Sequence, residues 1–308
     1  GKSYWLAAQM REIPSPKNPD EFNYKEYLTY YNIYYKSYIK SRKQIVESRR
    51  PRTVVNGLIF TLRNWSRKTL KSYLSNNKTF LVAQALILGG KNNLDEQTKG
   101  YFAQTGTLHV LAVSGLHVGI IFLILGWITK PLKRNKYSKW VRICILLLGI
   151  WLYAFVTGFS PSVQRASIMF TVFSLADLIK GKTIGLNSLF ASAFIMLVYN
   201  PFLIVNVGFQ LSYAAVLGIL LIYPPLYQLL TFSWVRNKIL HWLIDKSWSI
   251  VTISIAAQLA TFPISMFYFG QFPSYFMFSN LVVIPLIFLL VCSAVGIIAF
   301  SVFPIIAK

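Results

Sequence analysis

Apolar runs about as long as a lipid bilayer is thick constrain this chain more than any other feature of its sequence. A transmembrane helix needs roughly 20 predominantly apolar residues, and several runs between Phe102 and Phe303 approach or reach that length. Hydrophobic residues make up 55% of the 308 residues and charged residues only 13%, which is about half the charged fraction of a soluble domain. The sequence therefore predicts an all-α polytopic membrane protein.

The hydropathy pattern predicts about seven transmembrane helices plus interfacial amphipathic helices. The spans are expected near residues 107–129, 140–159, 162–180, 184–199, 207–230, 249–269 and 279–303. Residues 54–75 are predicted to form an amphipathic interfacial helix, and 233–246 an amphipathic connector, because apolar and cationic residues occupy different faces. Phe80–Leu88 is apolar but too short to span. Pro263 and Pro285 each remove a helix hydrogen bond, so several spans are predicted to be broken or kinked.

Loop charges predict the orientation in the membrane. The connections at 159–163, 200–206 and 270–278 carry no Lys or Arg. The alternate connections carry eleven: Lys130, Lys133, Arg134, Lys136, Lys139, Arg142, Lys180, Lys182, Arg236, Lys238 and Lys246. Because cytoplasmic loops are enriched in Lys and Arg, the charged connections are predicted to face the cytoplasm. The N-terminal region is then extracytoplasmic.

That N-terminal region is strongly basic. Residues 1–78 hold 16 Lys and Arg against five acids, which is half of the net charge of +22. Such a block favours a polyanion, either a nucleic acid or the headgroups of anionic membrane lipids. If the polyanion is a nucleic acid such as DNA, the surface at which it enters is predicted to contain Arg49, Arg50, Arg52, Arg63, Arg67, Lys68 and Lys71.

The segment Phe102–Trp127 is apolar but interrupted by five polar or small residues: His109, Ser114, Gly115, His117 and Gly119. Irregular backbone at membrane depth is tolerated where it is buried in protein or lines a wet cavity. Two interpretations remain open: polar groups that face a water-filled path, or imidazoles that only bond to the backbone of a broken helix. A serine hydrolase with Ser114 as nucleophile is disfavoured because no carboxylate lies nearby in the sequence.

Three further polar clusters interrupt later apolar runs. They are GFSPSVQRAS at 158–167, which contains Arg165; GFQLSYAAVLG at 208–218, which contains Gln210 and Ser212; and the stretch from Gln258 to Asn280 and Pro285. Single polar residues in membrane helices often serve as interhelical glue. Four clusters on different helices favour one shared polar cavity.

Several kinds of chemistry have no supporting pattern. The chain has three His, no His-X-Glu or Cys-X-X-Cys spacing, no P-loop and no acidic cluster, so neither a metal nor another cofactor is expected. Cys144 and Cys292 lie in apolar runs and are expected to be inert. We expect no enzymatic activity. A small-solute or ion transporter remains an alternative to a nucleic-acid channel.

Four ordered motifs resemble the membrane domain of the ComEC competence proteins, which form the DNA-uptake channel of natural transformation. The motifs are HVLAVSGLHVGI at 109–120, GFSPSVQRA at 158–166, GFQLSYAAVLGIL at 208–220 and QLATFPISMFYFG…NLVVIPL at 258–286. The resemblance implies a bacterial plasma-membrane channel for single-stranded DNA. It also implies that a path is lined or shaped by His109, Ser114, Gly115, His117, Arg165, Gln210, Ser212, Gln258 and Asn280.

The resemblance also implies a domain organisation. NPDEFNYKEYL at 18–28 is similar to the family segment that follows an OB-like domain. The expected parts are the end of an extracytoplasmic OB-like domain at 1–21, basic extracytoplasmic and interfacial helices at 22–106, and a transmembrane channel domain at 107–308. The chain is expected to be part of a longer protein. Its expected partners are single-stranded DNA, membrane lipids, an external DNA receptor, a cytoplasmic motor and a second copy of the chain.

Overall fold

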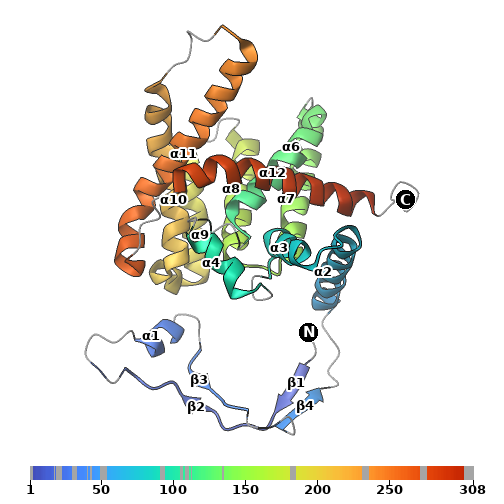
Figure 1. Cartoon of the computed structure of the whole chain (residues 1–308), viewed down its shortest axis with the longest axis vertical. Helices are drawn as coiled ribbons and strands as arrows, with labels where there is room; N and C mark the ends of the chain where they lie inside the picture. The colour runs from blue at the N-terminus through green and yellow to red at the C-terminus, as the bar shows by residue number, and fades with distance from the viewer. Residues whose placement is uncertain are drawn as a thin grey trace.

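A computed structural model shows a mainly helical protein with a small strand-containing region at its N-terminal end (Figure 1). The structure describes residues 3–16, 18, 23–29, 33–39, 41, 44–48, 54–90, 94–104, 107, 111, 113–133, 135–180, 185–230, 236–270 and 276–301. His109 and Arg49, Arg50 and Arg52 lie outside these residues, so their predicted roles stay predictions.

Short antiparallel strands organise the first 48 residues. β1 (Ser3–Leu6) pairs with β4 (Ile45–Ser48), and β2 (Arg11–Glu12) pairs with β3 (Tyr35–Lys36). The short helix α1 (Tyr24–Thr29) lies between β2 and β3 in the chain. The β1–β4 pairing joins residues on both sides of the boundary expected at residue 21, and the domain limits stay a prediction.

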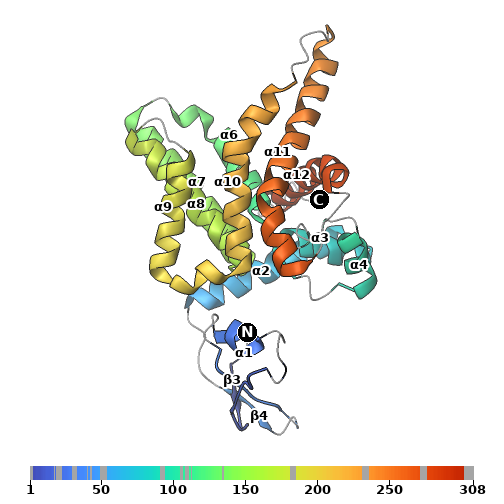
Figure 2. The same ribbon diagram turned by 90° about the vertical axis from the view of Figure 1, so that its left-hand side faces the viewer.

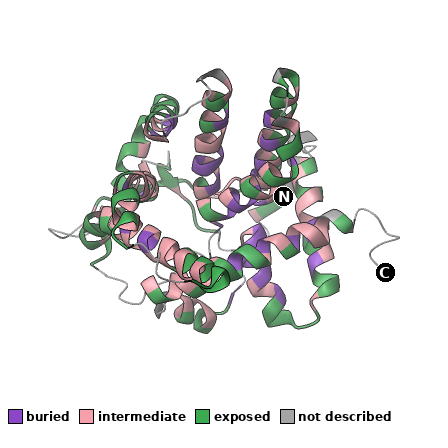
Figure 3. Ribbon diagram, turned by 90° about the horizontal axis from the view of Figure 1, so that it is seen from above, coloured by how far each residue is buried: buried purple, intermediate pink, exposed green. Residues whose placement is uncertain are grey.

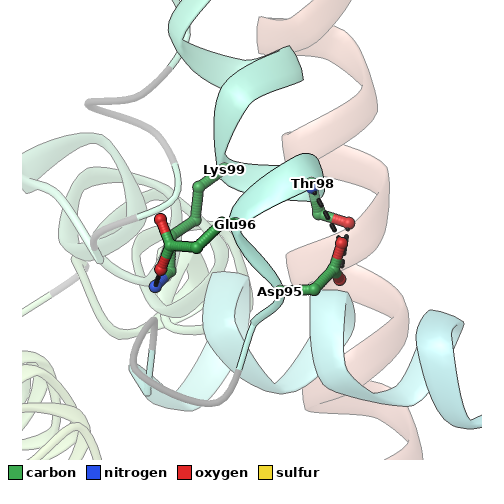
Figure 4. Close-up of polar contacts among 4 residues, drawn as sticks. All are labelled: Asp95, Glu96, Thr98 and Lys99. Carbon is green, nitrogen blue, oxygen red and sulfur yellow. Dashed lines mark hydrogen bonds and ion pairs between the residues drawn. The ribbon is translucent and has the colours of Figure 1, made fainter.

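Three helices precede the long apolar segments. They are α2 (Val54–Tyr73), α3 (Asn77–Leu88) and α4 (Glu96–Gln104). Before α4, Asp95 accepts hydrogen bonds from the Thr98 amide (3.0 Å) and hydroxyl (2.8 Å), and Lys99 bonds Glu96 at 2.7 Å (Figure 4). The bonds from the Thr98 amide and hydroxyl lower the pKa of the Asp95 carboxyl. Asp95 thus stabilises the start of α4 while it is ionised.

The remaining helices form the main bundle. They are α6 (Gly115–Ile128), α7 (Lys136–Val156), α8 (Pro161–Lys180), α9 (Gly185–Tyr199), α10 (Val207–Gln228), α11 (Lys238–Phe269) and α12 (Phe276–Phe300), with short 3-10 turns η3 (Lys130–Lys133) and η4 (Pro201–Val205). Helix α12 runs across the front of the upright helices in Figure 1 and is seen nearly end-on in Figure 2.

Four of the described helices are long and apolar enough to cross a membrane: α7, α10, α11 and α12. In α10, α11 and α12 only 17% of the most apolar window is buried inside the protein. Many residues of the bundle helices are exposed, as the green parts of the ribbon in Figure 3 show. They include large apolar residues such as Leu148 on α7 (71% exposed) and Phe267 on α11 (82%). Lipid is the solvent that such surfaces suit.

The expected count of seven spans is not reached by length and composition alone. α6 and α9 are apolar but have only 14 and 15 residues, and α8 carries Arg165 and Asp177. The expected connector at 233–246 also differs from the structure, because residues from Lys238 onward already belong to α11, one helix of 32 residues. Charges interrupt the hydropathy of this segment but do not interrupt its helix. α11 and α12 continue through Pro263 and Pro285.

α10 and α11 form an antiparallel pair whose adjoining ends project beyond the neighbouring helices (Figure 2). The two helices approach very closely at Gly218, where an added Cβ would lie 2.5 Å from the Ala260 Cβ and 2.6 Å from the Ala256 carbonyl oxygen. We call Gly218, Ala256 and Ala260 the small-residue contact. Such residues let membrane helices pack at short distance without polar bonds.

Candidate functional site

The predicted break in the first apolar segment coincides with a helix start. Ser114 is the N-cap of α6, in an extended conformation, and the helix begins at Gly115. The Ser114 amide donates to His117 Nδ1 at 3.2 Å, and the Ser114 Oγ lies 3.1 Å from the same nitrogen. Because Nδ1 accepts a backbone N–H, the neutral ring carries its hydrogen on Nε2. His117 is thus a capping residue of a broken helix.

His117 is fully buried, and its Nε2 has no hydrogen-bond partner among the described residues. The bond from the Ser114 amide to Nδ1 supports the interpretation that His117 bonds only to the backbone of a broken helix. The unpartnered Nε2 supports the interpretation that the imidazole faces another polar group or a water-filled path. No described set of three or more His, Cys, Asp or Glu could hold a metal ion.

Helix α8 is bonded to the same break. The Ser162 hydroxyl donates to the Val113 carbonyl at 2.6 Å, and Gly115 packs against Ala166. These contacts bring the motif around Ser114 together with GFSPSVQRAS. The first two predicted clusters are therefore neighbours in space.

Arg63 connects α2 to this region. Its guanidinium donates to the carbonyls of Gly89 (3.0 Å) and Leu88 (3.4 Å) at the end of α3, and lies 2.8 Å from where a Gly158 Cβ would be. Gly158 has a positive φ of 78° and turns the chain from α7 toward α8, which only glycine does without strain. We call Arg63, Val113, Ser114, His117 and Ser162, with the carbonyls they bind, the polar junction.

The basic face of α2 therefore divides into two parts. Arg63 is half-buried and bonded within the protein, whereas Arg67, Lys68 and Lys71 are exposed. Arg63 has a structural contact that the sequence pattern did not indicate, because a four-residue charge repeat does not show which side chain meets another helix. The assignment of this face to DNA stays a prediction.

Arg165 belongs to α8, and its side chain lies beside the first residues of α10. It is only 7% exposed, and its terminal nitrogens lie 3.7 Å and 3.8 Å from where a Gly208 Cβ would be. Asn206 caps α10 by accepting the Phe209 amide at 3.1 Å. A helix N-terminus carries a partial positive charge, so Arg165 adds a full charge to an already positive position. This arrangement suits an anion.

The third cluster takes part in two ways. The Gln210 side-chain amide donates to the Ile204 carbonyl at 2.8 Å and so ties η4 to α10. Ser212 instead lines a cavity of about 280 Å³ between α6, α8, α9 and α10, together with Gly115, Ala166 and Ser188. The cavity is mainly apolar, and Gly115 and Ser212 both belong to its lining, whereas the sequence predicted a polar cavity.

The fourth cluster does not line that cavity. The Asn280 side-chain amide donates to the Ser254 hydroxyl at 3.2 Å and ties α12 to α11. Gln258 lines a separate groove of about 430 Å³ with Phe262 and Phe276. Neither residue lines the cavity of about 280 Å³, and the shared cavity expected for all four clusters stays a prediction.

Ser188 is a cavity residue that the sequence analysis missed. It is 5% exposed on α9, and its Oγ has no hydrogen-bond partner among the described residues. Ser188 and Ser192 lie four residues apart on one helix face, both buried. That spacing of small polar residues within an apolar run is the sequence pattern by which they could have been found.

Comparison with known proteins identifies the family. The family described as Competence protein matches residues 86–308, which is most of the chain. The chain belongs to the Competence protein family. The family match contains the whole bundle, the cavity and Arg165, whereas α2 precedes it.

The chain is similar to three named relatives. It is 29% identical to ComE operon protein 3 of Bacillus subtilis over 92% of this chain and 34% of that protein. It is 25% identical to Competence protein ComA of Neisseria gonorrhoeae over 51% and 23%, and 26% identical to Recombination protein 2 of Haemophilus influenzae over 66% and 26%. The chain thus spans about a third or less of these relatives. No solved structure matches it.

Proposed function

We propose that this chain forms the membrane part of a conduit that passes single-stranded DNA across a bacterial plasma membrane during competence. The observation that carries the proposal is the buried Arg165 at the N-terminus of α10, next to the cavity. A strand with one charge per nucleotide cannot cross hydrocarbon and needs cationic and apolar contacts along its path. Membership of the Competence protein family and the names of the relatives support the same function.

The proposed topology takes α6, α8 and α9 as crossings in addition to α7, α10 and α11. The seventh predicted span, α12, runs transverse to these helices in Figure 1. The Lys and Arg asymmetry of the loops places the N-terminal region outside and the α10–α11 tip in the cytoplasm. The exposed Arg67, Lys68 and Lys71 of α2 would then collect DNA on the entry side. An external receptor, a cytoplasmic motor and a second copy of the chain belong to this proposal as partners.

The test is DNA uptake in cells that carry the full-length protein with Arg165→Gln. Loss of one buried charged contact to phosphate should lower internalised labelled DNA by at least about tenfold, and Arg165→Lys should restore part of it. Arg236→Gln, at the opposite end of the bundle, is the control and should keep normal uptake. Normal uptake by Arg165→Gln at normal membrane levels would refute the proposal.

A second candidate is an intramembrane serine hydrolase, which the 3.1 Å contact between Ser114 Oγ and His117 Nδ1 favours. The competing fact is that the same nitrogen accepts the Ser114 amide, as a helix cap does. Labelling of the full-length protein by a fluorophosphonate, lost in Ser114→Ala, would establish this alternative. The conduit proposal expects no labelling.

A further inference from the structure

The cavity between α6, α8, α9 and α10 has the dimensions of a site for one small rigid group. Its volume is about 280 Å³, close to the lower limit of small-molecule sites. Along α10 it extends from Ser212 to Leu220, eight residues or about 12 Å.

The lining has apolar faces and two hydroxyl residues, Ser188 and Ser212, of which Ser188 is the one whose Oγ is buried without a hydrogen-bond partner among the described residues. Phe170 and Phe173, about one turn apart on α8, contribute aromatic rings, and Ser188 from α9 contributes a hydroxyl. Burial of a hydroxyl without a partner is unfavourable and calls for an explanation such as a bound group. Only 5% of Ser188 is exposed, and no described residue forms a hydrogen bond with its Oγ. A hydrogen-bonding group that enters the cavity can supply the partner that Ser188 lacks.

A positive charge marks one end of the cavity. Arg165 directly precedes Ala166, which lines the cavity, and its guanidinium lies beside Gly208. Gly208 precedes Ser212 by four residues, so the charge lies about 6 Å along the helix from the start of the cavity. The site therefore combines a cation near one end with aromatic faces and hydroxyls in its lining.

We propose that the cavity receives one base of a single-stranded DNA, with the attached phosphate held by Arg165 at the N-terminus of α10. This inference rests on the proposed DNA conduit. A base has two apolar faces for the phenylalanine rings and hydrogen-bonding atoms at its edge for Ser188. Every base has such faces, so the site accepts any sequence.

A lipid acyl chain is the alternative occupant of an apolar cavity in a membrane. An acyl chain would fill the volume, but it has no polar atom to bond the Ser188 hydroxyl. The unpartnered Ser188 hydroxyl in the lining therefore favours a base. The two occupants are separated by removing bases while keeping phosphates.

The experiment compares two strands on the full-length protein in lipid nanodiscs at one fixed salt concentration. One is an oligothymidylate of about 16 nucleotides, and the other has the same length and phosphates but abasic sites. Fluorescence anisotropy should show at least about fivefold tighter binding of the intact strand, as expected for base–aromatic stacking. Ser188→Leu, which fills the cavity, should bring this ratio to about one, and Ser188→Ala should lower it about twofold or more.

Ser174→Ala is the matched control, because Ser174 is also buried on a bundle helix with an unpartnered Oγ but does not line the cavity. It should keep the wild-type ratio. If Ser188→Leu does not fold, Ser188→Ala decides.

Each other outcome overturns the inference. Equal binding of both strands by the wild type removes the base site and leaves the conduit standing, whereas no binding of either strand rejects the conduit as well. An unchanged ratio in the folded Ser188 variants places the base elsewhere. Equal binding, together with a phospholipid that copurifies with wild type and is lost in Ser188→Leu, assigns the cavity to an acyl chain.

Discussion

The polar junction and the small-residue contact hold helices together by different means. The junction joins α2, α3, α6 and α8 through side chains that bond to backbone at chain breaks, such as Ser162 to Val113 and Arg63 to Gly89. The small-residue contact joins α10 and α11 by backbone proximity at Gly218. Polar bonds allow interrupted helices and buried charge, so the candidate site lies near the junction. The small-residue contact instead lets two uninterrupted helices, α10 and α11, pack at short distance.

The largest effect is expected from breaking the small-residue contact with Gly218→Val. The new side chain meets the Ala256 carbonyl, which belongs to the backbone and cannot turn away, so unfolding free energy should fall by about 3 kcal/mol. Steric trapping of the full-length protein measures it. Gly296→Val on α12, where no atom lies within 4 Å of an added Cβ, is the control. Equal effects of the two substitutions would contradict the close approach.

Arg63→Ala tests the junction against the exposed part of the same helix. Removing a charged donor from the Leu88 and Gly89 carbonyls should cost about 2 kcal/mol of stability. Arg67→Ala, on the exposed face, should change stability by less than about 0.5 kcal/mol. The thermal midpoint in detergent, followed by size-exclusion fluorescence, distinguishes them. A similar midpoint for both would show that Arg63 is only a surface cation.

Ser162→Ala removes a single neutral bond of the junction. Loss of the 2.6 Å bond to Val113 should lower stability by about 1 kcal/mol, measured again by steric trapping. The exposed Ser293 on α12 supplies a control, Ser293→Ala, which should have no measurable effect. If the two serines behave alike, the α8–break contact contributes nothing to stability.

The smallest effect concerns Asp95, outside both regions. The pKa of its carboxyl is lowered by bonds from Thr98, so its stabilisation of α4 is complete at neutral pH and is lost as pH falls through that lowered pKa. Hydrogen exchange at the Thr98 amide, corrected for intrinsic rate, should accelerate in acid. Asp95→Asn should abolish this pH dependence, while Glu96→Gln should keep it. A flat profile in the wild type would disprove the capping role.

Sequence patterns predicted a helix well where the signals that start and end it lie within its own segment. α2 at Val54–Tyr73, the short α3 and the start of α6 at Gly115 follow the predicted periodicity and break. The length of α11 was not predicted, because hydropathy reports the preferred solvent of a segment and not whether its backbone stays helical. The transverse course of α12 depends on packing against α6 and α11, which no single segment encodes.

The site was predictable only in part. Gly115, Arg165 and Ser212 were singled out because polar and small residues are rare in apolar runs, and the structure gathers them around one cavity and the adjoining start of α10. Asn280 and Gln258 stood out for the same reason, but Asn280 bonds α12 to α11 and Gln258 lines a separate groove. Sequence shows that a residue is unusual for a membrane helix, whereas only the packing of several helices shows which unusual residues meet.

The unbroken course of α11 has a mechanical consequence. The helix is about 48 Å long. Its close contact with Gly218 of α10 is at Ala256, which lies about 27 Å from the first residue of α11 and about 20 Å from the last. The longer arm contains no proline, whereas Pro263 lies in the shorter one. α11 is therefore one continuous helix that contacts Gly218 of α10 part-way along its length. A displacement of the projecting tip would be transmitted along α11 to the opposite end of the bundle.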